Sequence, residues 1–372
     1  MGGRLISALT NMSPLTPHAK VFDRNIRTLF WDAFRLVWAE PAQAAFFARA
    51  LVHQVAAARR RRAWTKRGVA VPPLAIVSVT ERCNLSCAGC YAHAKPVAAG
   101  AVRAELSSDD LRAFLAEADE LGVSLVMFAG GEPFLRDDIL ELARGFPRMT
   151  FVVFTNGLLL DGDRVACLKT LRNVVPVVSF EGDRVLTDGR RGAAVYKRVG
   201  EAVARLRAAR VFWGTSFTAT RANAAAITDE GFLRGWAREG CRLFFFVEYV
   251  PVKAGTEEWA LTPAQRARVT EISENLTRRM PALGLAFPGN EDQYGGCLAA
   301  GRGFIHLSAR GAVEPCPFAP FSDTNLVGIS LREALGSRLF ETIRAEHGRL
   351  TETNGGCALW ANREWVKSLL EA

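Results

Sequence analysis

Short runs of apolar, often β-branched residues recur along the middle of the chain, and amphipathic stretches separate them. Continuous apolar runs of this length are typical of strands that are buried in a parallel sheet. Six such runs span residues 74–80, 124–130, 150–156, 174–181, 212–220 and 242–252. The helical stretches between and after them span residues 109–121, 137–144, 164–171, 195–210, 228–238 and 263–280. Six βα units in sequence predict an α/β fold with a parallel sheet and right-handed crossovers.

The pattern before residue 74 is helical. Apolar residues recur at helical spacing over 22–38 and again over 42–58, and Pro41 separates the two stretches. We therefore predict an N-terminal helical extension over residues 1–73. The apolar face of its second helix is expected to pack across the βα units, and the alternative is that this face lies on a membrane surface.

The pattern changes again near residue 287, where glycine and cysteine become dense. A hairpin is predicted over 305–316 with its turn at 309–311, and one helix is predicted over 331–346. The chain thus divides into the extension, a central domain over 74–286 and a small C-terminal domain over 287–372.

Length and composition fit this division. The 372 residues exceed one ordinary small domain and suit one α/β barrel with additional pieces. The N-terminus lacks a secretory signal pattern, and no run of about 18 apolar residues occurs, so a cytoplasmic location is expected. Eight cysteines in a reducing compartment indicate metal binding or catalysis rather than disulfides.

The net charge is +9, and much of it lies in the basic run 59–67. Such a run can contact RNA, anionic lipid or an acidic peptide, or it can be the solvated end of a helix. No RNA-binding motif accompanies it, and no DNA partner is expected.

Three cysteines carry the first candidate chemistry. Cys83, Cys87 and Cys90 have the spacing C-x3-C-x2-C directly after the first apolar run. Three thiolates on one loop can hold three irons of a [4Fe–4S] cluster, which leaves the fourth iron to bind a substrate or cofactor. The alternative is a zinc site with His93 as a fourth ligand.

Several segments at predicted strand ends accompany the cysteines: GGEP at 130–133, TNG at 155–157, SFEG at 179–182 and TDGRRG at 187–192. Together with the cysteine spacing they resemble the radical S-adenosylmethionine (radical SAM) superfamily, in the subgroup with SPASM or Twitch C-terminal domains. The resemblance implies a partial (βα)6 TIM-like barrel with a lateral opening for substrate.

The resemblance also implies an activity. The [4Fe–4S] cluster on Cys83, Cys87 and Cys90 would reductively cleave S-adenosylmethionine (SAM) to methionine and a 5′-deoxyadenosyl radical. That radical would abstract hydrogen from an unactivated carbon. The electron would come from an external one-electron donor such as flavodoxin or ferredoxin.

Residues that contact SAM follow from the same resemblance. They are Tyr91, Gly130, Gly131, Glu132, Pro133, Thr155, Asn156, Ser179, Glu181 and Arg191. Glu181 stands where the subgroup usually has Asp. Gly89 stands where many members have an aromatic residue against the adenine, so Tyr91 or residues after the sixth strand are expected to cover it.

A second cysteine set lies in the C-terminal domain. Cys297 and Cys316 enclose Gly311 in the pattern C-x13-G-x4-C, and Cys357 follows. This resembles the start of a SPASM or Twitch auxiliary cluster and implies a second iron–sulfur cluster, with one iron open or bound by a ligand other than Cys. A zinc site or a metal-free remnant is the alternative. Cys167 and Cys241 are predicted to be small core residues.

Substrate contacts are expected at the end of the sixth strand. Glu248, Tyr249 and Lys253 are candidate catalytic residues there, and Asp292 and Tyr294 are candidates for the same cavity. A small-molecule or lipid substrate is favoured because the N-terminal extension shows no strands of a peptide-binding domain. The alternatives are a peptide-modifying radical SAM enzyme and, from other classes, an iron–sulfur electron carrier or a zinc-containing RNA-binding protein.

Overall fold

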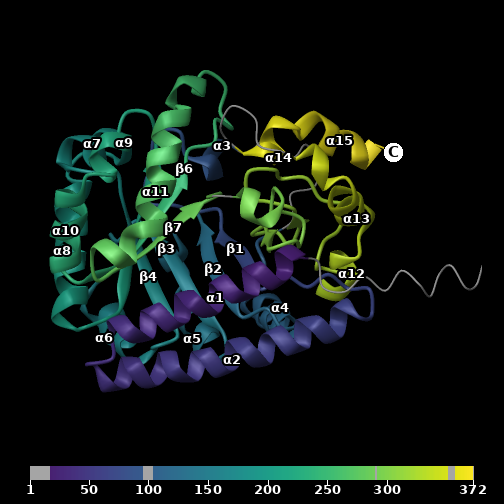
Figure 1. Cartoon of the computed structure of the whole chain (residues 1–372), viewed down its shortest axis with the longest axis horizontal. Coiled ribbons are helices and arrows are strands. Elements are labelled where there is room, and N and C mark those ends of the chain that lie inside the picture. The colour runs from purple at the N-terminus through teal and green to yellow at the C-terminus, as the bar shows by residue number, and fades with distance from the viewer. Residues whose placement is uncertain (1–16, 95–103, 290, 351–356, 372) are drawn as a thin grey trace, which may run out of the picture.

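The computed structural model describes residues 17–94, 104–289, 291–350 and 357–371. These residues contain one nine-stranded sheet in the order β7-β6-β5-β4-β3-β2-β1-β8-β9 (Figure 1). Every neighbouring pair is parallel except β8 and β9. The strands are β1 Leu74–Thr80, β2 Leu125–Gly130, β3 Thr150–Thr155, β4 Val174–Phe180, β5 Trp213–Ala219, β6 Cys241–Glu248, β7 Leu283–Phe287, β8 Phe304–Leu307 and β9 Val313–Glu314.

The six predicted βα units are confirmed, and their helices lie close to the predicted ranges. The helices between residues 91 and 279 are α3 Tyr91–Ala94, α4 Ser108–Leu121, α5 Ile139–Arg144, α6 Gly162–Thr170, α7 Arg184–Arg191, α8 Val195–Ala208, α9 Ala224–Ile227, α10 Glu230–Arg238 and α11 Pro263–Arg279. Apolar residues of the strands, such as Phe128, Phe180 and Trp213, are buried in one large core cluster with the helices. Burial of this core drives the fold.

The strand β7 and the parallel pairing of β8 with β1 were not predicted. β7 is short and contains Gly284, where a Cβ atom would lie 2.3 Å from the carbonyl oxygen of Ser273 in α11, so close packing of that helix explains an otherwise weak strand pattern. β8 pairs in parallel with β1. The rings of Phe287 and Phe304 lie 5.2 Å apart and connect the two edges of the parallel strands. The barrel is therefore nearer to closure than six units imply.

The N-terminal extension packs against the sheet, as the favoured interpretation expected. It consists of α1 Pro17–Leu36 and α2 Pro41–Thr65. Phe30 and Phe47 belong to a second core cluster together with Val177 and Phe245 of the strands. Gln54 of α2 accepts a hydrogen bond from Ser124, just before β2, at 2.7 Å. Thus α2 crosses the end of the barrel at which the strands begin (Figure 1).

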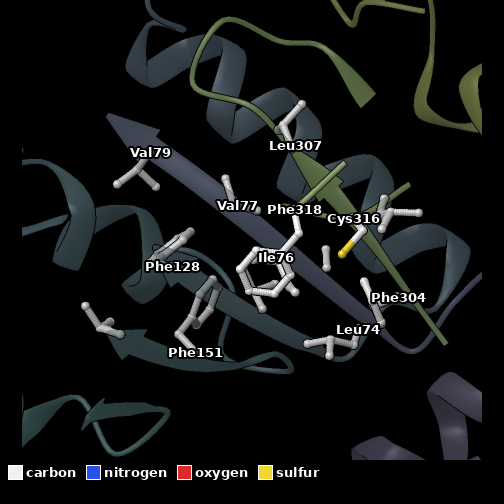
Figure 2. Packing of buried hydrophobic residues seen from close by; sticks show 14 of the residues in the cluster. Leu74, Ile76, Val77, Val79, Phe128, Phe151, Phe304, Leu307, Cys316 and Phe318 are labelled. Atoms are coloured by element: carbon white, nitrogen blue, oxygen red, sulfur yellow. The ribbon is translucent and has the colours of Figure 1, made fainter. Parts of the chain in front are cut away.

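The C-terminal part shares the main sheet. The predicted hairpin is confirmed as β8 and β9, with Gly311 in the turn at φ +87°. Figure 2 shows Cys316 and Phe318 packed beside Ile76 of β1 and Phe304 of β8. The single helix predicted over 331–346 was wrong, because Gly336 ends α12 (Leu331–Leu335) and Ser337 caps the start of α13 (Arg338–Ala345).

The remaining elements are 3-10 turns and two helices near the C-terminus. They are η1 Pro133–Leu135, η2 Glu257–Trp259, η3 Glu291–Tyr294, η4 His347–Arg349, α14 Ala358–Ala361 and α15 Arg363–Glu371. Among the described helices, none combines the length and the apolar character needed to cross a membrane.

Candidate active site

A cavity of about 220 Å³ opens where strands β1 to β6 end. Barrel enzymes place their chemistry at this end of the strands. Cys83, Cys87 and Cys90 are partly buried and all line the cavity. Ile76, Met127, Phe154 and Phe245 add an apolar floor.

The cysteine loop is packed against residues that follow β6. Gly89 has φ +65°, and a Cβ atom there would lie 2.7 Å from the ring of Trp259 and 2.8 Å from the hydroxyl of Tyr249. The rings of Tyr249 and Trp259 lie 5.4 Å apart. Aromatic groups from after β6 therefore occupy the place next to Gly89, and Gly89 leaves them room.

The GGEP turn contacts the start of the same loop. Gly131 donates a backbone hydrogen bond to Thr80 at 2.8 Å, and Glu132 donates one to Arg82 at 2.8 Å. A Cβ atom on Gly131 would lie 1.9 Å from the carbonyl oxygen of Arg82. The glycine is therefore needed for close approach of two backbone segments, which positions the turn beside the cysteines.

Glu132 connects this turn to the TNG turn. Its carboxylate accepts hydrogen bonds from the Thr155 hydroxyl at 2.7 Å, the Asn156 backbone N–H at 2.7 Å and the Phe134 N–H at 3.1 Å. Burial raises the pKa of Glu132, and these hydrogen bonds oppose the shift. Asn156 in turn donates to Asn84 of the cysteine loop at 2.6 Å. The Glu132 carboxylate thus joins the GGEP and TNG turns, and Asn156 connects both to the cysteine loop.

The carboxylate of Glu181 is ion-paired with two arginines of α7. Its Oε1 accepts hydrogen bonds from Arg190 at 2.5 Å and Arg191 at 2.8 Å, while Oε2 is buried and has no hydrogen-bond partner. Arg191 lines the cysteine cavity, whereas Glu181 lines an adjoining cavity with Ala88 and Arg190. Burial raises the pKa of Cys87, and the two arginines oppose that shift.

Ser179, which is predicted to contact SAM, lines the cysteine cavity. Its hydroxyl lies 3.0 Å from the hydroxyl of Ser216 on β5, which lines the same cavity. Ser216 was not predicted, because it lies within a strand pattern. The available signal was Ser179, which lies at the same level on the neighbouring strand β4.

Tyr91 lies between the two cysteine sets. It lines the cavity, and its ring meets Phe318 edge to face at 5.4 Å. Burial raises the pKa of Tyr91, and the nearby thiols of Cys90 and Cys316 act in the same direction. The cysteine loop and the C-terminal cysteines are therefore separated by an aromatic pair.

The three candidate catalytic residues after β6 have different surroundings. Glu248 lines the cavity but is paired with Arg266 through hydrogen bonds of 2.9 and 3.0 Å. Tyr249 also lines it, and its hydroxyl donates to Thr256 at 2.8 Å. Lys253 is exposed and is not among the residues that line the cavity.

Tyr294 of η3, a candidate for the same cavity, does not line it. Tyr294 accepts a hydrogen bond from Asn25 of α1 at 2.7 Å, and the side chain of Asp292 lies outside the described residues.

Cys297, Cys316 and Cys357 are all buried. The thiols of Cys316 and Cys357 are hydrogen-bonded, and Cys297 lies close enough to Cys357 for a direct electrostatic effect. Burial raises the pKa of Cys297 and Cys316.

Glu291, which the sequence analysis missed, is buried in the same place. It acts electrostatically on Cys297 and Cys357, and it accepts a hydrogen bond from the Leu298 N–H at 3.3 Å. It is a carboxylate that can supply a ligand other than Cys.

The arrangement of the thiols bears on what they can hold. Within the described residues, no three or more His, Cys, Asp and Glu side chains are grouped tightly enough for a single metal ion. Cys83, Cys87 and Cys90 nevertheless line one cavity, so their thiolates could together hold an iron–sulfur cluster there. His93 is exposed and does not line that cavity, so it does not complete a zinc site there.

Comparison with known proteins agrees with this geometry. Residues 77–218 match the model of the radical SAM superfamily. The chain carries a radical SAM domain. It is therefore an enzyme that uses SAM, and the matched residues include the cysteine loop, the GGEP and TNG turns and strands β2 to β4.

Two curated relatives from Methanosarcina barkeri extend the comparison. The AdoMet-dependent heme synthase is 27% identical over 292 residues, which cover 70% of this chain and 81% of the relative. The Fe-coproporphyrin III synthase is 36% identical over 123 residues, and this match spans only 30% of its length.

Among solved structures, SuiB of Streptococcus suis bound to its precursor peptide SuiA has a TM-score of 0.62 at 19% identity. The matched region covers 83% of this chain and 75% of SuiB. At this identity the likeness concerns the fold alone.

Proposed function

We propose that this radical SAM enzyme abstracts hydrogen from an unactivated carbon of a small-molecule or lipid substrate and has an auxiliary iron–sulfur cluster. When bound, the first cluster supplies the electron that cleaves SAM, and the protein supplies orientation and exclusion of water. The observation that carries the proposal is the convergence of three thiols, the GGEP turn and Arg191 on one largely apolar cavity.

The described residues have distinct parts in this proposal. Cys83, Cys87 and Cys90 would hold the cluster, and the GGEP backbone would orient the SAM ammonium group. Arg191, Ser179 and Asn156 would orient polar parts of SAM, while Tyr249 would hold the loop through Gly89. Glu248 is proposed as a substrate-orienting group, since its pairing with Arg266 fixes it at the cavity wall.

The apolar floor supports the preference for a hydrophobic or small substrate. Met127, Phe154, Phe245 and Phe287 line the cavity and give a hydrocarbon body a place from which water is excluded. The names of the two curated relatives denote the synthesis of heme and of Fe-coproporphyrin III, which are small molecules. Peptide modification remains the second candidate, because SuiB was solved with a precursor peptide.

For the auxiliary cluster we propose Cys297, Cys316 and Cys357 as thiolate ligands and Glu291 as the ligand of the fourth iron. The support is the burial of all four side chains in one place. In this proposal the auxiliary cluster accepts an electron from the substrate, and the external donor that reduces the first cluster is a flavodoxin or ferredoxin.

The test is an iron and sulfide count after anaerobic reconstitution. Wild type should hold about eight irons, and both the Cys83/Cys87/Cys90→Ala and the Cys297/Cys316/Cys357→Ala variants should hold about four. Production of 5′-deoxyadenosine from SAM should be lost in the first variant. Cys167→Ala, at a partly buried thiol outside both sets, is the matched control. Wild type with about four irons, none of them left in the first variant, would exclude the auxiliary cluster.

A further inference from the structure

The positive charge of the chain is concentrated in the helical extension. Residues 17–67 contain eleven Lys and Arg against three Asp and Glu, a net charge of +8, while the whole chain has a net charge of +9. Of the three acids, Asp23 is paired with Arg61, Asp32 lies 3.9 Å from Arg35, and Glu40 is exposed. The other 321 residues are thus almost neutral overall, so this charge is a local property.

The basic run at the end of α2 divides between two faces. Arg60 and Arg61 point inward to Asp119 and Asp23, at 3.2 and 2.5 Å. Arg59 and Arg62 are exposed. The run is therefore partly structural, and the exposed remainder belongs to a longer stripe on the outer side of the helix.

Exposed aromatic residues accompany the charge along α1. Ile26, Phe30, Ala33 and Val37 are buried against the barrel. The opposite stripe, at spacings of three and four, holds Arg24, Arg27, Trp31, Arg35 and Trp38, all exposed. Trp31 is 51% exposed and Trp38 is 75% exposed, which is unusual for the largest apolar side chain.

The outer side of α2 has the same composition. Its exposed stripe holds Arg49, Val52, Val55, Arg59 and Arg62. Val52 is 67% exposed and Val55 is 37% exposed. The two helices are joined by a short turn and pack against each other as an antiparallel pair (Figure 1). We call these ten residues the basic aromatic face.

We propose that the basic aromatic face docks the enzyme on an anionic lipid bilayer. Arginines attract the negative surface of such a bilayer. Tryptophan places its apolar ring and its N–H group at the boundary between lipid and water, and exposed valines gain apolar contact there. The helices would lie in the plane of the surface without crossing it.

Other classes of anionic partner fit less well. A redox protein must approach the cysteine loop, whereas α2 crosses the opposite end of the barrel, far from α3, which directly follows that loop (Figure 1). A nucleic acid would use the arginines but gains little from exposed Val52 and Val55. An apolar component within the charged stripe therefore favours a bilayer.

The docking does not depend on the proposed substrate. With α2 against the membrane, the end of the barrel that holds the cysteines faces away from the bilayer. The face would recruit the whole enzyme to a membrane surface, and a soluble substrate could still enter the cavity.

The experiment is co-sedimentation of the full-length protein with vesicles. Wild type should bind vesicles that mix phosphatidylglycerol with phosphatidylcholine, and it should bind pure phosphatidylcholine weakly. Arg49/Arg59/Arg62→Glu should weaken binding to the anionic vesicles by at least about 100-fold. Each basic residue near an anionic bilayer contributes a factor of about five, and the three new carboxylates are repelled in addition. Trp31/Trp38→Ala should also weaken it, while leaving the net charge unchanged.

Matched controls separate a local face from overall charge. Arg198/Arg207/Arg278→Glu changes three exposed arginines on α8 and α11 by the same amount of charge and should keep the binding. Circular dichroism checks that each variant is folded, and SAM cleavage should be unaffected in all of them. Equal loss in the control variant, or no binding by wild type at low salt, would overturn the proposal. So would binding to RNA as tight as to anionic vesicles and insensitive to loss of Trp31 and Trp38, which would indicate a nucleic-acid surface.

Discussion

The two cysteine sets differ in how much protein surrounds them. Cys83, Cys87 and Cys90 are partly buried on a loop that lines an open cavity, whereas Cys297, Cys316 and Cys357 are buried within the core cluster. A cluster on the first set can meet SAM and substrate, and a cluster on the second is shielded from solvent. In the proposed function, the first set therefore serves bond cleavage, and the second serves electron transfer or folding stability.

The largest effect should separate the two sets. Replacing Cys83, Cys87 and Cys90 by Ala should reduce SAM cleavage to background, because the ligands of the reducing cluster are gone, and should leave the melting temperature nearly unchanged. Replacing Cys297, Cys316 and Cys357 should lower the melting temperature, because three buried thiols and any cluster they hold are lost together. Assays of 5′-deoxyadenosine and thermal unfolding measure both effects. Equal losses of melting temperature in the two variants would contradict the expectation that the buried C-terminal set contributes more to stability.

One glycine near each cysteine set tests how tightly the backbone is constrained there. Gly131→Ala should destabilise the protein by about 3 kcal/mol, since the new methyl group would meet the rigid carbonyl of Arg82. Gly311→Ala places a Cβ atom at φ +87° and 2.8 Å from the Asn325 side chain, whose amide is hydrogen-bonded to the backbone of Arg310 and Val327. A loss of about 1–2 kcal/mol is therefore expected, smaller than that at Gly131. Urea unfolding gives both free energies. A larger loss at Gly311 would show that the hairpin is the more constrained region.

The aromatic cover of the cysteine loop is expected to act on SAM binding. Trp259→Ala removes the ring that lies against Gly89 and should raise the KM for SAM by about tenfold with a smaller change in kcat, since it loses binding common to substrate and transition state. Trp360→Ala, at a partly buried tryptophan of the C-terminal part, is a control that should leave this KM unchanged. An unchanged KM in Trp259→Ala would assign the ring to loop packing alone.

The smallest expected effect concerns one ligand. Glu291→Gln should keep the iron count near that of wild type and change only the EPR signal that survives in the Cys83/Cys87/Cys90→Ala background. The reason is that Gln keeps the size of the side chain but is a weaker ligand for iron. Glu314→Gln, at another buried acid near Cys316, is the comparison variant. An identical spectrum for Glu291→Gln would remove Glu291 from the proposed ligand set.

Much of the barrel could be predicted because its signal is local. Runs such as 74–80 are mostly apolar and are buried at every position, and a capping box of Ser107 and Asp110 stands at the start of α4. β7 escaped prediction because Gly284 weakens its strand pattern. Only the packed structure shows that this glycine leaves room for the backbone of α11. The break at Gly336 and Ser337 was equally local but was overlooked in an otherwise helical pattern.

The candidate site divides in the same way. The cysteine spacing and the GGEP turn were readable as motifs, and the cavity brings them together. The contacts that the site side chains make could not be predicted from the sequence. Glu181 meets Arg190 and Arg191, and Lys253 lies away from the cavity, because side-chain partners depend on how loops from different strands approach one another.

By itself the sequence determined the six βα units, the three-cysteine loop and the resemblance to the radical SAM superfamily, since these depend on periodicity and short spacings. Tertiary structure alone decided that β8 joins β1, that aromatic rings after β6 cover Gly89, and that Glu291 lies beside the C-terminal cysteines. It also decided which arginines of the basic run point outward. The physical reason is that helix and strand patterns are set by neighbours along the chain, whereas burial and charge pairing are set by neighbours in space.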